Sequence, residues 1–121
     1  MATLNTKLVL TSTDTGTNAL DLTTTDALTV GQPNVDLSRV SIATGSAQAL
    51  VPSNSLFSYV YINVISGTGS NPWIQVLLGG DVKMKIMVGE FAWLPLYSTQ
   101  AITAEAQVGA CVVEYGYWSR A

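Results

Sequence analysis

The chain has 121 residues, one cysteine, no histidine and a formal net charge of −3. This length predicts a single domain with one hydrophobic core. The five Lys and Arg residues of this acidic chain are mostly scattered and form no basic patch, so we expect no nucleic-acid partner. No apolar run approaches the roughly 18 residues of a membrane-spanning helix. The N-terminus shows no signal-peptide pattern. We expect no membrane partner.

Along the chain, short β-branched or aromatic runs alternate with Gly, Pro, Asn and Ser at intervals of about 8 to 12 residues, which is typical of a sandwich or barrel. In chain order, strands are expected at residues 8–12, 19–24, 27–30, 35–44, 48–52, 57–66, 73–79, 82–88, 91–96, 102–108 and 111–118. Some of the first five are expected to merge or to be irregular, and the expected total is about eight strands. The predicted fold is all-β: a single antiparallel β-sandwich, jelly-roll-like, with no substantial helix.

The two parts of the chain differ in composition. The two Phe, five Tyr and three Trp residues all lie between Phe57 and Trp118. Residues 1–55 are rich in Thr, Asp, Leu and Val, and we expect them to supply edge strands, loops or an arm that lies on a neighbour. Residues 56–118 are expected to hold the aromatic, core-forming strands of a single domain that spans 1–121.

Alternation of apolar and polar residues assigns the faces of several strands. In 102–108, Glu105 belongs to a polar set that faces away from the apolar residues, so we expect it on the outer face. In 35–44 the apolar alternation breaks, and a bulge near Ser38 and Arg39 would restore it. The Gly- and Asn-containing stretch 66–72 is expected to be a hairpin loop.

The stretch KIMVGEFAWLPLYST predicts a corner between two strands. Gly89 permits a turn with positive φ, and Glu90 is expected to hydrogen-bond or cap the turn amides. Pro95 cannot donate to a ladder, so the strand that follows the turn is expected at a sheet edge or bulged. We therefore predict a β-turn-β corner whose second strand meets a neighbouring subunit.

Three predicted strands, 57–66, 73–79 and 111–118, are apolar on both faces, whereas a free antiparallel sandwich normally exposes one polar face to water. Only 11% of the residues are charged, so much of the polar surface is neutral and suits packing against other protein. We favour burial in a homo-oligomer over a simple tolerance of exposed aromatic residues. The candidate interface residues are Trp73, Phe91, Trp93, Tyr97, Tyr117 and Trp118.

Catalytic chemistry is not expected. Without histidine the commonest general base and transition-metal ligand are absent, and no nucleophile, zinc or phosphate-loop motif occurs. Glu90, Glu105 and Glu114 lie on or beside strands, but Glu105 is expected on an outer face and Glu114 has no obvious partner. Cys111 lies in an apolar run and is expected to be a small buried hydrophobic residue. The spacing of three acids, Asp14, Asp21 and Asp26, matches no known calcium-binding loop. We expect a non-enzyme with no catalytic residue, cofactor or metal.

Four phrases in the second half of the chain form a pattern: YVYINV (59–64), WIQVLL (73–78), VGEFAWLPL (88–96) and ITAEAQVGACVVEYGYW (102–118). This pattern resembles that of small virion accessory proteins of tailed bacteriophages, in which a Pro-Gly-Glu turn precedes an aromatic residue and Leu-Pro. Here Val88 stands where proline is more usual, so the turn is less rigid. The resemblance implies an antiparallel β-sandwich, often jelly-roll-like, that has no catalytic residues and assembles as a homo-oligomer.

In function, the resemblance implies a capsid decoration, or cement, protein that binds and stabilises the outer phage head and lies on the outer capsid surface of the virion. Its partners would be the major capsid protein and copies of itself, with a homotrimer favoured over a dimer. The alternative is a tail, baseplate or head-fibre component of the same fold. A more distant alternative is a carbohydrate-binding module with a sugar-stacking platform made of Trp73, Trp93, Tyr117 and Trp118.

Overall fold

The computed structural model describes residues 2–13, 20–31, 35–52, 57–95 and 100–119. Within these ranges there are ten strands and no helix. The strands are β1 (Ala2–Ser12), β2 (Leu20–Val30), β3 (Val35–Ile42), β4 (Gln48–Val51), β5 (Phe57–Gly67), β6 (Trp73–Leu78), β7 (Asp81–Met87), β8 (Phe91–Pro95), β9 (Ile102–Gln107) and β10 (Cys111–Ser119).

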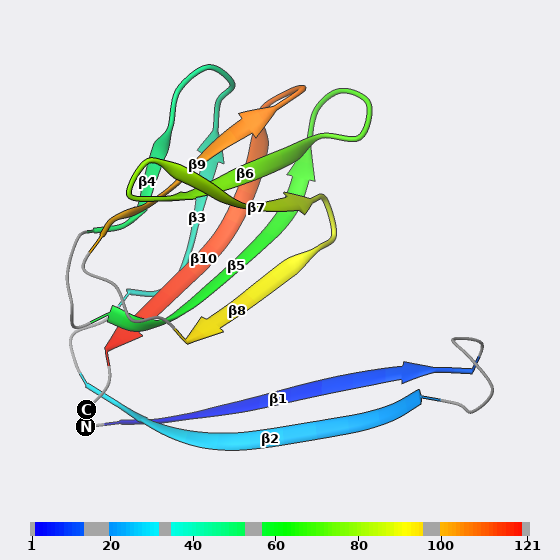
Figure 1. The fold of residues 1–121 in the computed structure, drawn as a ribbon, viewed down its shortest axis with the longest axis vertical. Helices are drawn as coiled ribbons and strands as arrows, with labels where there is room; N and C mark the ends of the chain where they lie inside the picture. Colours follow the sequence, from blue (N-terminus) through cyan, green and yellow to red (C-terminus); the bar gives the residue numbers. More distant parts are fainter. Residues whose placement is uncertain (1, 14–19, 32–34, 53–56, 96–99, 120–121) are drawn as a thin grey trace.

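Eight of these strands form two four-stranded antiparallel sheets that pack face to face (Figure 1). The first sheet has the order β3-β10-β5-β8, and the second has the order β4-β9-β6-β7. The pairs β3 with β10, β4 with β9, β5 with β8 and β6 with β7 make the chain one long hairpin wound across both sheets. This is the arrangement of a jelly roll. It confirms the predicted all-β, jelly-roll-like sandwich.

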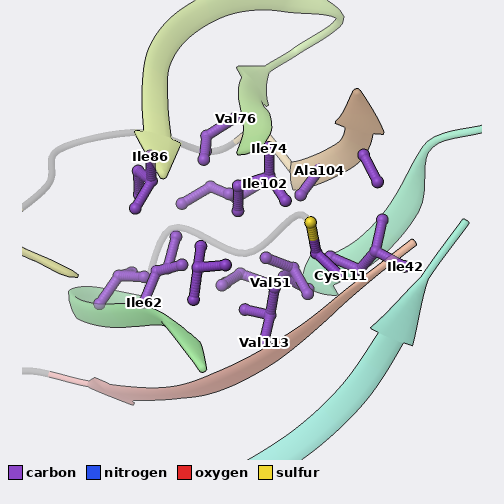
Figure 2. Packing of buried hydrophobic residues seen from close by; sticks show 14 of the residues in the cluster. Ile42, Val51, Ile62, Ile74, Val76, Ile86, Ile102, Ala104, Cys111 and Val113 are labelled. Carbon is purple, nitrogen blue, oxygen red and sulfur yellow. The ribbon is translucent and has the colours of Figure 1, made fainter. Parts of the chain in front are cut away.

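The core lies between the two sheets, where side chains from both inner faces meet (Figure 2). Alternation turns every second side chain of β5 inward, so Val60, Ile62 and Val64 are buried. From the second sheet, β6 adds Ile74 and Val76. Each such side chain stabilises the fold by about 1.5–3 kcal/mol when fully buried. The other buried members of the cluster are Ile42, Leu50, Val51, Ile86, Ile102, Ala104, Ala106, Cys111, Val113 and Tyr117.

Residues 1–55 contribute to two different parts of the structure. Strands β3 and β4 belong to the sandwich and supply Ile42, Leu50 and Val51 to its core. Strands β1 and β2 instead pair with each other in a separate two-stranded sheet. The two short strands expected between residues 19 and 30 are one continuous strand, because the register of β2 against β1 runs unbroken.

Two local predictions have different outcomes. Tyr115 pairs with Ser38 but Tyr117 pairs with Val35, so the register of β3 shifts just before Ser38, close to the predicted bulge. The hairpin predicted at 66–72 was wrong. Strands β5 and β6 lie in different sheets, so this segment crosses from one sheet to the other. Turn residues specify that the chain reverses, but the sheet in which the next strand pairs is decided by tertiary packing.

Strands β7 and β8 meet at the predicted corner. Gly89 has a φ of 89°, where a Cβ atom would be strained. The N–H of Met87 donates to Oε1 of Glu90 at 2.8 Å, and the N–H of Glu90 donates to the carbonyl of Met87 at 2.9 Å. Glu90 therefore caps the turn, as predicted. The corner leads from the second sheet to β8, an edge strand that tolerates Pro95.

The hairpin of β1 and β2 projects from the sandwich, and we call it the arm (Figure 1). At its base, Val30 is buried and the N–H of Gly31 donates to the carbonyl of Ser119 at 2.9 Å. From this base the arm runs along the outer side of the first sheet and extends past β8 (Figure 1). The jelly roll itself is complete without it.

Candidate functional site

The arm has one apolar face and one polar face. In its register Leu4 pairs with Leu28, and Leu10 pairs with Leu22. Because side chains alternate along a strand, the even-numbered residues of both strands share one face. This leucine face is mostly apolar: it carries Leu4, Leu8, Leu10, Leu20, Leu22 and Leu28, together with Thr6, Ser12, Thr24 and Asp26. The opposite face is mostly Thr, together with Asn5, Lys7, Val9, Asp21 and Ala27.

Only the base of the leucine face is covered within the chain. Leu4 and Leu28 are half-buried, close to the buried Val30. Farther out, four leucines are each 42–43% exposed, and we call them the distal leucine patch: Leu8, Leu10, Leu20 and Leu22. Burial of apolar surface stabilises a protein by about 25 cal/mol per Å², and surface that stays exposed to water does not contribute this stabilisation. A contiguous patch of this kind marks an interaction surface more often than scattered exposed leucines do.

The outer face of the first sheet carries the aromatic residues. The rings of Tyr59 and Trp93 stack with their centroids 5.8 Å apart, and Trp118 approaches Trp93 at 5.7 Å. Tyr61 of β5 lies opposite Trp93 of β8 on one side and opposite Gly116 of β10 on the other. Phe91 continues the row along β8. We call this surface the aromatic face: Tyr59, Tyr61, Phe91, Trp93 and Trp118.

A cleft of about 550 Å³ separates the arm from the aromatic face. Tyr61, Phe91 and Trp93 line it on the sheet side. The arm contributes Thr6, Lys7, Leu8, Thr24 and Asp26. Phe91 remains 61% exposed beside this cleft. The arm of the same chain therefore lies over the aromatic face without filling the space in front of it.

A polar row lies next to the aromatic residues on the same sheet. The Nε of Arg39 donates to Oε2 of Glu114 at 3.2 Å, so Glu114 has the partner that the sequence did not reveal. Asn63 donates through Nδ2 to the hydroxyl of Tyr61 at 3.0 Å. These contacts satisfy polar groups within the chain. The row borders the aromatic face and brings no pair of carboxylates together.

The structure distributes the candidate interface residues over three environments. Phe91, Trp93 and Trp118 lie together on the aromatic face. Trp73 lies on the outer side of the second sheet, where the Nζ of Lys85 is 4.5 Å from its ring centroid. Tyr117 is 9% exposed and belongs to the core cluster. The remaining candidate, Tyr97, lies outside the described residues.

The remaining reactive side chains are dispersed. Glu105 lies on the second sheet and Glu114 on the first. The thiol of Cys111 is buried, and burial raises its pKa, which disfavours the nucleophilic thiolate. Among the described residues, no three His, Cys, Asp or Glu side chains gather at a site that could hold a metal. Asp14, one of the acids considered for calcium, falls outside them.

Sequence reasoning identified the aromatic residues but missed the leucine face. The sequence does contain a pattern that indicates this face: leucine occurs at positions 4, 8, 10, 20, 22 and 28, which are all even. That pattern becomes visible only when 2–12 and 20–30 are treated as two full-length strands in one hairpin. Shorter predicted strands concealed the common face.

Comparisons with known proteins add no family assignment. No family model matches the chain, and no curated protein sequence has significant similarity to it. In the part of the chain that the structure describes, no helix has the length and apolar character needed to cross a membrane.

Proposed function

We propose that this protein is a structural component of a phage virion, a decoration or cement protein that binds the outer surface of the head and stabilises it. It acts together with copies of itself and with the major capsid protein. The proposal assigns it no catalytic activity and no cofactor. Its interaction surfaces are the arm and the aromatic face.

The observation that carries this proposal is an arm with an uncovered apolar face on an otherwise complete jelly roll. Isolated two-stranded hairpins are marginally stable in water. An arm of 11-residue strands therefore gains stability when another surface covers the distal leucine patch. The resemblance of the second half to virion accessory proteins supports a capsid shell as the place where such contacts form.

Purified full-length protein added to expanded phage heads that lack decoration tests the proposal. We expect saturable binding with a fixed number of copies per shell and a higher temperature of shell disruption. Heads that already carry their decoration protein serve as the control and should bind no additional copies. An absence of binding to undecorated heads of the phage that encodes this chain would overturn the proposal.

A carbohydrate-binding module is the second candidate, because Phe91 and Trp93 line a cleft. The platform suggested by the sequence is not assembled on one surface. Trp73 lies on the other sheet, and Tyr117 lies in the core. Retention on a glycan column that is lost in Trp93→Ala, while the fold persists, would favour this candidate over a decoration protein.

A further inference from the structure

We infer that the arm of one copy packs the outer part of its distal leucine patch, Leu10, Leu20 and Leu22, onto the aromatic face of a second copy, over the edge formed by β8. The inference rests on the self-association part of the proposed function and adds the two surfaces that make the contact. It does not depend on where in a virion the protein lies.

The position of the distal leucine patch indicates which side a partner approaches. Leu8 lines the cleft with Phe91, so this part of the arm still lies over its own sheet. Leu10 and Leu22 pair with each other two residues beyond Leu8, toward the tip of the arm, and the outer part of the arm extends past β8 (Figure 1). A partner that covers them must therefore sit beside the β8 edge.

The β8 edge presents a surface of matching character. β8 ends the first sheet, so one side of its backbone is not paired with another strand of the described chain. Of the large hydrophobic residues that the structure describes as exposed, Phe91 has the highest exposed fraction, 61%. Two copies that meet edge to edge at β8 would each place an overhanging arm above the Phe91 of the other.

The size of the contact favours a reciprocal exchange. At a rise of ~3.3 Å per residue and a strand spacing of ~4.8 Å, the distal half of the arm is a flat face of roughly 200 Å². Counting both partners, one arm on one aromatic face then buries roughly 400 Å², and two reciprocal contacts bury roughly 800 Å². These areas treat the faces as flat and leave out the contact between the two β8 edges. Stable interfaces begin at about 1,200 Å². Reciprocal contacts approach this range, whereas a single contact does not.

Electrostatics permits a second copy as the occupant. Each chain carries a net charge of −3, so identical copies repel each other on average. The distal leucine patch contains no charged residue, and neither does the aromatic face. Contact between these two surfaces brings no charged side chain of either set into the interface, although Lys7 and Asp26 line the adjacent cleft. Both halves of the interface are also present on every chain, as a closed symmetric assembly requires.

The first test compares two faces of the same arm. Leu10→Thr combined with Leu22→Thr removes the central pair of the leucine patch, and threonine preserves strand propensity. Val9→Thr is the matched control, because Val9 is 49% exposed on the opposite face. Sedimentation equilibrium should show a wild-type oligomer, unchanged by Val9→Thr and weakened about tenfold for each leucine removed. A monomeric wild type, or an equally stable oligomer of the double variant, would overturn the inference.

The second test identifies the surfaces directly. Leu10→Cys and Asn63→Cys, in a Cys111→Ala background, place one thiol on the arm and one beside Phe91. A short bismaleimide is added to a mixture of isotope-labelled and unlabelled protein. We expect cross-linked peptides that combine both isotopes. Cross-links confined to one chain, or none in an intact oligomer, would contradict arm exchange. An intact, exchanged oligomer that fails to bind heads would overturn the proposed function and leave this inference standing.

Discussion

The ring of Trp93 lies almost parallel to that of Tyr59, with an interplanar angle of 6° and a centroid distance of 5.8 Å. Trp118 adds a tilted contact with Trp93 at 5.7 Å. These three rings join the edge strand β8 to β5 and β10 across the outer face of the first sheet. The aromatic face is therefore a rigid part of the jelly roll as well as a candidate contact surface.

Replacing Trp93 should weaken this face. We expect Trp93→Ala to lower the free energy of unfolding by about 2 kcal/mol, because a half-buried ring and its stacking contacts are lost. Urea denaturation measures the change, and near-UV circular dichroism reports the loss of the stacked pair. Trp73→Ala on the second sheet is the control and should cost about 1 kcal/mol, because its ring contacts the Nζ of Lys85 and no stacked aromatic pair is lost with it. Equal losses for both variants would argue against the stacking.

The capped corner predicts a graded series at one position. Glu90→Ala removes the acceptor of the Met87 N–H and should lower the free energy of unfolding by about 1 kcal/mol. Glu90→Gln keeps an oxygen at the same place and should lose less than half of that amount. Thermal or urea unfolding of the three proteins distinguishes these cases. If glutamine were as destabilising as alanine, the oxygen acceptor would not be the stabilising feature.

A strained residue lies in the turn between β9 and β10. Val108 has a φ of 79°, which a β-branched residue rarely adopts, and its side chain is 60% exposed. Val108→Asn should raise the free energy of unfolding by about 1 kcal/mol, because asparagine tolerates this conformation. Val82→Asn, at an exposed position within β7, is the control and should not stabilise the protein. A lower urea midpoint for Val108→Asn would contradict the prediction.

Alkaline pH should destabilise the sandwich through a buried thiol. Burial raises the pKa of Cys111 above its ordinary value of 9.0. Above that pH the thiol ionises in the unfolded chain but stays protonated in the folded one, so stability falls as pH rises. Below pH 9.0 the thiol is protonated in both states, so its contribution to the stability of the fold is fully present. Burial, followed by the charge of Tyr115, also raises the pKa of Tyr117, so the decline continues above pH 10.

The variant Cys111→Ala separates the contribution of the thiol from that of Tyr117. At pH 7 it should lower the free energy of unfolding by about 1 kcal/mol, because a buried sulfur atom is lost. Its stability should then fall less steeply than that of the wild type just above pH 9. Urea denaturation across the range from neutral to alkaline pH measures both slopes. Identical slopes would show that Cys111 does not cause the decline.

The fold could be predicted from local patterns because its strands alternate and its turns carry Gly, Pro and Asn. The cap of the corner at Gly89 and Glu90 is made by contacts among residues 87–90, so this local feature was predicted correctly, although the N–H of Gly89 also donates to the carbonyl of Val64 on β5. The segment 66–72 has equally clear turn residues, but its flanking strands pair with partners distant in sequence. Whether such a turn closes a hairpin or crosses between sheets depends on the whole fold.

The candidate site was only partly predictable for a similar reason. Phe91, Trp93 and Trp118 were predicted as interface residues because they are aromatic, and the jelly roll brings them onto one face. Tyr117 and Trp118 are adjacent and equally aromatic, yet alternation sends the first into the core. The leucine face required the register of a hairpin with 11-residue strands, which strand propensity alone does not supply.

Electron cryomicroscopy of the virions that contain this protein tests the central proposal most directly. A map that resolves secondary structure should show clustered jelly rolls of about 12.8 kDa on the outer surface of the head. Each should have an arm of two long strands that crosses onto a neighbouring copy. The same jelly roll found only on the tail, or its absence from the head surface, would contradict the assignment as a head decoration protein.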